Sequence, residues 1–180
     1  MNLEIYFNDA MSYDDYIKLL DKNRTLHDLH YKKFYADSRI DQEEFIKETF
    51  NILVITEPWC GDSLALLPII QKLSERNPTW EIRILLRDKN PELMNHFLTR
   101  DVRSIPIFLF LDERFNLITR WGPRPEAAQQ IYEDHRTQIE SGQITKQDVI
   151  KKIRTFYAKD RGQSSLEELK VILKKVLVEK

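Results

Sequence analysis

A lone cysteine, Cys60, is the residue of this 180-residue chain whose type and position point most directly to chemistry. It follows the apolar run 52–55, which predicts a buried strand, and it precedes residues 64–73, whose apolar side chains recur at helical spacing. The unpaired N–H groups at the start of a helix favour an anion, and a thiolate is such an anion. Cys60 is therefore a candidate nucleophile, and a buried structural cysteine is the alternative.

Two polar neighbours would influence this thiol. Ser63, in the first turn of the predicted helix, is placed to hydrogen-bond the thiolate and favour its charged form; the alternative is a plain helix residue. Asp62 puts a carboxylate beside the sulfur, which disfavours ionisation. It is either an acid that interacts favourably with the helix dipole or a proton acceptor for the thiol.

The segment 59–63, Trp-Cys-Gly-Asp-Ser, resembles the thioredoxin active-site motif Trp-Cys-Gly-Pro-Cys. Pro68 stands eight residues after Cys60, where thioredoxins carry the proline that kinks the active-site helix. Pro106 stands forty-six residues after Cys60 and precedes the apolar strand 107–111, as does the cis-proline that faces the cysteine in thioredoxins. Residues 112–121 predict a hairpin that ends before Gly122, like the C-terminal hairpin of that fold. The resemblance covers residues 50 to 141.

This resemblance implies an α/β, thioredoxin-like fold, a central mixed sheet flanked by helices, with extra helices at the N- and C-termini. We expect one domain over residues 1–180. Its parts are an N-terminal helical extension (1–50), a thioredoxin core (51–141) and a C-terminal helical extension (142–180).

The resemblance also implies a substrate site. Trp59 would shield one side of Cys60, and Ile105 and Pro106 would shield the other. The backbone of Ile105 would pair with an extended substrate segment. The sequence departs from thioredoxin where Ser63 replaces the second cysteine and where Val54 replaces a buried acid. Full dithiol activity is therefore not expected.

Two functions from different classes remain. The first is a monothiol thiol–disulfide oxidoreductase, in which Cys60 forms a mixed disulfide that an external thiol releases. The second is a redox-inactive binding or adaptor protein that uses the groove at Ile105–Pro106. Arg100, Arg103 and Arg124 would bind the carboxylates of a low-molecular-weight thiol such as glutathione, or they are ordinary surface arginines. No cofactor is expected beyond such a thiol co-substrate.

Composition limits the partners. The 28 Lys and Arg residues balance 29 Asp and Glu, which gives no reason to expect a nucleic acid or an anionic membrane. Expected partners are proteins or small molecules with a thiol or disulfide, and the oligomeric state is open.

The histidines show no metal-ligand spacing with the cysteine, so no metal site is expected. The start of the chain lacks a signal-peptide pattern, which with one cysteine predicts a cytoplasmic protein.

Local signals predict the flanking helices. Ser12 with Asp15 forms the aspartate version of a capping box, a second helix is expected from Thr25, and an acidic one from Asp41. The aromatic residues of this extension either pack on the sheet or form a partner-binding surface. Beyond the hairpin we expect a helix from Ala127 to about Ser141, then one capped by Thr145, and a last one capped by Ser164 or Ser165.

Overall fold

The computed structural model describes residues 1–34 and 49–178, and within them the chain forms a five-stranded sheet. The strand order is β1-β3-β2-β4-β5. The central pair β2 and β3 is parallel and the other pairs are antiparallel, so the sheet is mixed, as expected. The strands are β1 (Met11–Ser12), β2 (Phe50–Thr56), β3 (Trp80–Leu86), β4 (Ile107–Leu111) and β5 (Leu117–Trp121).

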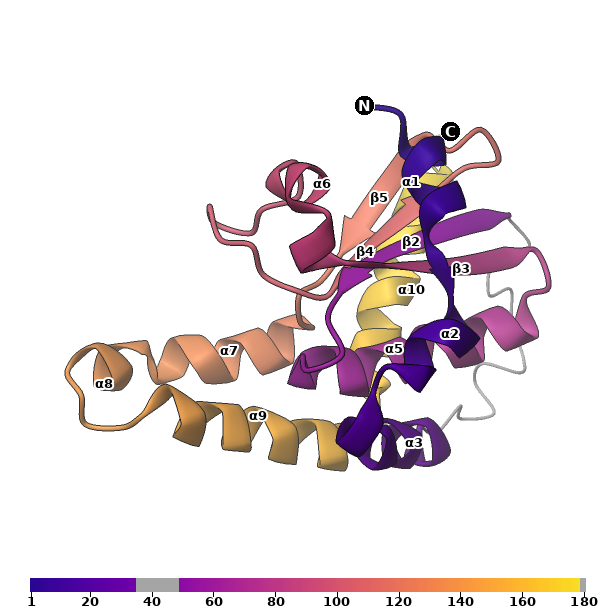
Figure 1. Cartoon of the computed structure of the whole chain (residues 1–180). Coiled ribbons are helices and arrows are strands. Elements are labelled where there is room, and N and C mark those ends of the chain that lie inside the picture. Colours follow the sequence, from indigo (N-terminus) through magenta and orange to yellow (C-terminus); the bar gives the residue numbers. More distant parts are fainter. Residues whose placement is uncertain (35–48, 179–180) are drawn as a thin grey trace.

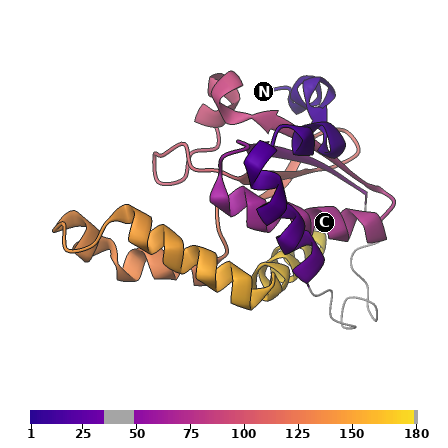
Figure 2. The same cartoon turned by 60° about the horizontal axis from the view of Figure 1, so that its bottom comes forward.

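Helices cover both faces of this sheet (Figure 1). Helices α1 and α6 lie on one face, and α3, α5, α9 and α10 lie on the other. Helices α7, α8 and part of α9 project beyond the sheet as an arm, which Figure 2 shows from a second direction. No helix in the described ranges has both the length and the apolar character needed to cross a membrane. The bounds are α1 (Leu3–Asp9), α2 (Tyr13–Lys18), α3 (Arg24–Lys33), α5 (Gly61–Arg76), α6 (Pro91–Asn95), α7 (Glu126–Asp134), α8 (Arg136–Glu140), α9 (Lys146–Asp160) and α10 (Gln163–Val178), with 3-10 turns at Asp21–Asn23 and Arg87–Lys89.

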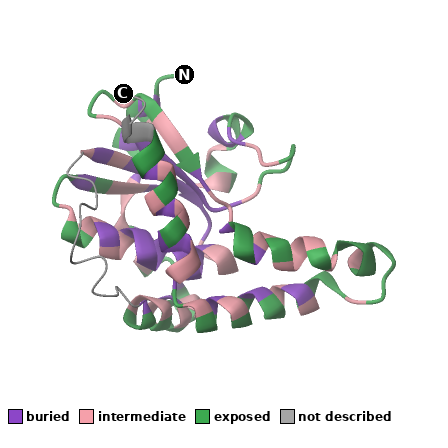
Figure 3. Cartoon of the chain, turned by 180° about the vertical axis from the view of Figure 1, so that it is seen from behind, coloured by how far each residue is buried: buried purple, intermediate pink, exposed green. Residues whose placement is uncertain are grey.

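The central strand β2 is buried on both faces. Ile52 and Val54 pack into the core beneath α5, whereas Leu53 and Ile55 pack into the core beneath α1 and α6. This two-sided burial explains why the sequence of the strand is continuously apolar instead of alternating. Figure 3 shows that the centre of the sheet is buried, whereas the outer end of the arm, around α8, is mostly exposed. The strand that leads to Cys60 is therefore held by packing on both of its faces.

The N-terminal extension packs on the core. Ser12 is the N-cap of α2, as predicted, and its hydroxyl accepts from the backbone N–H of Asp15. The Asp15 carboxylate accepts from the Ser12 hydroxyl and not from its backbone N–H, so the full capping box is not formed. Tyr16 and Phe34 are buried in the core, which favours packing over a partner-binding surface for these two residues. Residues 11–12 form an edge strand that was not predicted, because two residues are too few for any periodicity to reveal. The helix expected from Asp41 lies outside the described residues.

The C-terminal helices differ from the sequence prediction at two places. The helix expected from Ala127 to Ser141 breaks at His135, whose ring lies 2.8 Å from the carbonyl oxygen of Ile131. Helix α10 begins directly after Gly162, so the expected serine cap is wrong. Ser164 instead lies inside that helix and donates to Asp160. The other predicted cap is confirmed, since Thr145 and Asp148 form a reciprocal capping box at α9.

Candidate functional site

Cys60 is the N-cap residue of α5, immediately after the turn that follows β2. Its side chain is buried with 6% exposure, and its thiol donates to the carbonyl oxygen of Ile105 over 3.5 Å. The peptide bond between Ile105 and Pro106 is cis. The structure therefore brings together Cys60, Ile105 and Pro106 from two loops at one end of the sheet. Pro68 lies inside α5, at the position that the resemblance assigned to the helix kink.

The surroundings of Cys60 disfavour its thiolate. Burial raises the pKa of the thiol most, and the charge of Asp62 raises it further. Hydrogen bonds from Ser63 and from the backbone of Asp62 act in the opposite direction but are weaker. The net effect is a pKa above the ordinary value, so the start of α5 does not by itself activate this sulfur.

Ser63 is fully buried and shares a short hydrogen bond with the hydroxyl of Thr56, the last residue of β2. The two hydroxyls satisfy each other across the strand–helix turn, where an unpaired hydroxyl would be costly. Ser63 therefore supports the turn as well as favouring the thiolate. Thr56 was missed by the sequence analysis, since nothing in a strand-ending threonine marks its partner.

Asp62 points to two residues from the C-terminal part of the chain. Its carboxylate accepts from Nε of Arg124 at 2.8 Å and from the hydroxyl of Tyr157 at 2.9 Å. Both sides of the ion pair are largely buried, with side-chain exposures of 12% for Asp62 and 20% for Arg124. Burial and the nearby Asp62 charge raise the pKa of Tyr157 well above its ordinary value. Asp62 thus ties α5 to the segment before α7 and to α9, a role that neither sequence interpretation contained.

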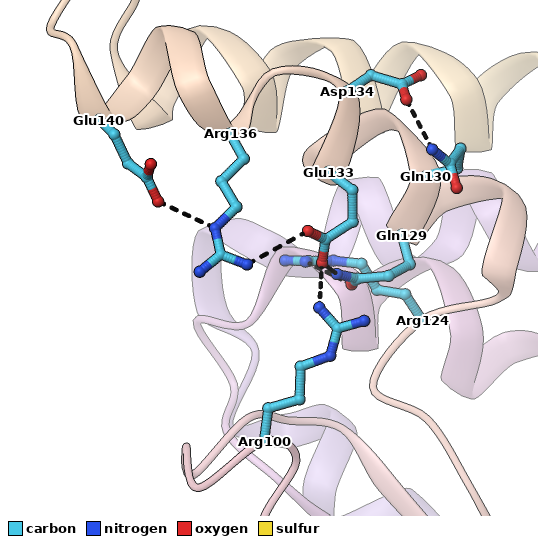
Figure 4. Close-up of polar contacts among 8 residues, drawn as sticks. All are labelled: Arg100, Arg124, Gln129, Gln130, Glu133, Asp134, Arg136 and Glu140. Carbon is cyan, nitrogen blue, oxygen red and sulfur yellow. Dashed lines mark hydrogen bonds and ion pairs between the residues drawn. The ribbon is translucent and has the colours of Figure 1, made fainter.

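The three candidate arginines each have a partner within the chain. Figure 4 shows Arg100 reaching up to Glu133 of α7, which also pairs with Arg136 and accepts from Gln129. Arg124 is held by Asp62. Arg103 is exposed, and its Nε donates to Asn95 at the end of α6 over 3.0 Å. They therefore do not form one ready-made carboxylate clamp beside Cys60.

Trp59 forms the exposed rim of the site, with 57% of its surface open to solvent. The guanidinium of Arg87 lies 5.0 Å from the centre of its indole, a cation–π arrangement. The same guanidinium donates to the carbonyl oxygen of Arg103 over 3.3 Å. Arg87, which the sequence analysis did not single out, thus connects the Trp59 turn to the loop that leads to Pro106.

The turn before Cys60 is held from the N-terminal extension. The hydroxyl of Tyr16 donates to the carbonyl oxygen of Glu57 at 3.1 Å, and the side-chain amide of Asn23 donates to that of Pro58 at 3.1 Å. The buried side chain of Glu57 accepts from the backbone N–H of Asp88 at 2.8 Å. These contacts join segments far apart in sequence, and no local signal could have predicted them.

Gly122, which directly follows β5, lies against the loop that carries Pro106. Its φ is +110°, and a Cβ there would lie 2.3 Å from the carbonyl oxygen of Pro106. A side chain is therefore excluded both by the backbone conformation and by the close approach of the proline loop. In the sequence Gly122 indicated only the end of a hairpin, although a glycine before a proline is also typical of a turn.

The described residues contain no group of three or more His, Cys, Asp or Glu side chains arranged as metal ligands.

Comparison with known proteins is consistent with this geometry. Residues 10–138 match a protein-family model described as Thioredoxin, so the chain belongs to the thioredoxin family. A search of curated proteins gave no match. The structure resembles an HIV epitope-scaffold protein with a TM-score of 0.72 and 18% identity, covering 97% of this chain and 99% of that one. It also resembles a protein of unknown function from Pseudomonas aeruginosa with a TM-score of 0.67 and 18% identity, covering 94% and 95%. At these identities the two structures show the fold alone.

Proposed function

We propose that this thioredoxin-fold protein carries out thiol–disulfide exchange through a mixed disulfide at Cys60. The observation that supports this function best is the position of the sulfur, 3.5 Å from the carbonyl oxygen of Ile105 at the start of α5. A peptide that lay extended along the backbone of Ile105 would bring its own disulfide close to that sulfur. In this proposal Trp59 and Arg103, both exposed, border the bound substrate.

The exchange needs two separate steps. In the first, the Cys60 thiolate attacks one sulfur of a disulfide R–S–S–R′, forms Cys60–S–S–R and releases R′ as a thiolate. In the second, an external thiolate attacks the R sulfur, forms a new disulfide and releases the Cys60 thiolate. Since Ser63 replaces the second cysteine and the chain has one cysteine in all, the second thiol comes from outside. A low-molecular-weight thiol is the proposed co-substrate.

Turnover of a glutathionylated peptide in the presence of glutathione tests this function. Wild-type protein should release the peptide thiol faster than glutathione does alone, and Cys60→Ser should abolish that gain. Ser63→Ala should lower that gain without abolishing it, because it removes a hydroxyl that favours the thiolate but keeps the thiol itself. Equal activity of the wild type and Cys60→Ser would refute the proposal.

A second function, binding without turnover, is favoured by a specific observation. The thiol is buried and its raised pKa keeps it protonated near neutral pH. An adaptor would use the same groove at Ile105–Pro106 to hold an extended segment of a partner, and it would bind that partner equally well as Cys60→Ser. Partner binding in a wild type without thiol-dependent activity would replace the first function by the second.

A further inference from the structure

A second site lies on the side of α5 that faces α3 and α9. There the structure has a partly enclosed cavity of about 90 Å³ between these helices and the link from α9 to α10. Leu26, Ala65 and Ile69 contribute apolar surface to it, and Phe34 packs close to Gly162 at one wall. Cys60 does not line this cavity, although its neighbour Gly61 does.

The polar part of the lining carries one sign of charge. Lys33, Arg154 and Arg161 line the cavity together with His30, and no aspartate or glutamate does. Across residues 1–34 and 49–178, these three cations form no ion pair with a carboxylate. The guanidinium of Arg154 lies 3.6 Å from the point where a Cβ on Gly61 would be. Positively charged side chains from three segments therefore line one cavity whose other lining is largely apolar.

Three carboxylates of the described residues near these cations in sequence have partners of their own. Asp28 pairs with Arg24, and Asp160 accepts from Ser164. Asp62 is held by Arg124 and by Tyr157. The pKa of His30 is lowered by its burial, and the charges of His27 and Lys33 lower it further. The rim is thus a region of positive potential that an anion would neutralise.

We propose that this cavity binds a small carboxylate whose apolar body is no larger than one aromatic ring or a short alkyl chain. The apolar body would lie against Ala65 and Ile69, and the carboxylate would lie at the rim beside Arg154. An apolar cavity of about 150 Å³ accommodates benzene, so about 90 Å³ limits the buried body to that size or less. This site is separate from the proposed redox function, because binding here needs no thiol.

An NMR titration of the isotope-labelled full chain tests the proposal. The probes are phenylacetate and hexanoate, which distinguish a ring from a chain, and 2-phenylethanol, which has the ring without the charge. At least one of the two acids should shift the amide signals of Gly61, Ala65 and Gly162, with a Kd of about 1 mM, as suits a ligand of this size. The alcohol should bind about tenfold more weakly than phenylacetate, because it lacks the ionic contacts at the rim.

Three variants locate the interaction. Arg154→Gln should weaken binding of the acid about three- to fivefold, the effect of one partly exposed ionic contact. Lys159→Gln on the same helix makes the same charge change outside the lining and should alter the Kd by less than about 1.5-fold. Ala158→Phe places a ring at the exposed edge of the cavity without overfilling the core, and it should abolish binding.

Three results would overturn the proposal. They are binding of 2-phenylethanol as tight as that of the tighter-binding acid, no shift in the cavity with either acid, or undiminished binding of the acid by Ala158→Phe. Because each variant can be checked for a native spectrum, loss of folding is distinguishable from loss of binding. Loss of turnover in Cys60→Ser leaves this titration unchanged, so the two proposals fail independently.

Discussion

The reactivity of Cys60 is set by three neighbouring features. Burial and the charge of Asp62 raise the pKa of its thiol, and hydrogen bonding from Ser63 lowers it. The strand–helix turn therefore supplies position, whereas the side chains around it decide how much thiolate is present. A monothiol site of this kind would exchange slowly near neutral pH and faster in alkali, because only the thiolate attacks.

Removing the charge of Asp62 should make Cys60 more reactive. In Asp62→Asn the repulsion is lost while Arg124 keeps its charge nearby, so the pKa of Cys60 falls and more thiolate exists at a given pH. We expect the rate of alkylation at about pH 7.5 to rise about three- to tenfold, since one pKa unit changes the thiolate fraction tenfold. Intact mass measures this rate directly, because the chain has a single thiol.

Tyr157→Phe is the control for that experiment. It removes a hydrogen bond to Asp62 but leaves the carboxylate and its charge in place, so its alkylation rate should stay closer to that of the wild type. If alkylation of Asp62→Asn were no faster than that of the wild type, Asp62 would not be raising the pKa of Cys60.

At the scale of elements, the hairpin of β4 and β5 positions the proline loop by direct contact at Gly122. Gly122→Ala should cost about 2–4 kcal/mol, because a methyl group would clash with the carbonyl oxygen of Pro106 at a positive φ. Gly142→Ala is the matched control, since Gly142 also has a positive φ, +75°, but no atom lies within 4 Å of its Cβ position. Its cost should be about 1 kcal/mol. Urea unfolding of both variants measures the difference, and equal costs would show that the clash is relieved.

The arm of α7 and α8 is connected to the loop before Pro106 by the pair of Arg100 and Glu133 (Figure 4). Arg100 is 68% exposed, so this pair should contribute less than about 1 kcal/mol to stability. Glu133→Gln should therefore leave the free energy of unfolding almost unchanged while loosening the loop. Faster amide hydrogen exchange at Thr99 and Val102, which bridge across the loop, would reveal the loosening. Unchanged exchange there would show that the pair does not hold the loop.

The sequence predicted the elements that depend on local patterns. Strand β4 lies at the predicted residues and β5 lies within the predicted hairpin, because short apolar runs between turn signals are distinctive. The pairing of β1 and the break at His135 were not predictable, because tertiary contacts and not periodicity decide them. In the site, the place of Cys60 followed from the strand–helix pattern, and that of the proline loop followed from the resemblance to thioredoxins. The partners of Asp62, Arg124 and Tyr157, lie 62 and 95 residues away in sequence, and no local pattern predicts either contact.

For the whole molecule, buried tyrosine hydroxyls and the buried thiol should make the free energy of unfolding fall at alkaline pH. Burial raises the pKa of Tyr16 and of Tyr157, as it does for Cys60. A group whose folded pKa is raised contributes stability that is complete below its unfolded pKa and is lost as pH rises through the folded value. The unfolded values are about 8.5 for cysteine and about 10 for tyrosine, so the free energy of unfolding should begin to fall at about pH 8.5 and fall faster above about pH 10.

Urea unfolding at several pH values between about 7 and 11 measures this dependence, with a slope of up to about 1.4 kcal/mol per pH unit for each group. Tyr16→Phe removes one ionisable hydroxyl and should make the decline above about pH 10 shallower, even though it loses the hydrogen bond to Glu57. A decline as steep as that of the wild type would mean that Tyr16 does not contribute to it.

The most direct test of the proposed function follows the reaction of folded protein with glutathione disulfide by intact mass as pH is raised. We expect one glutathionyl adduct, formed at a rate whose midpoint lies above the ordinary cysteine value of about 8.5 and removed by added thiol. Cys60→Ser should form none. Absence of the adduct at every pH where the protein stays folded, with rapid reaction once urea unfolds it, would contradict a redox role for Cys60.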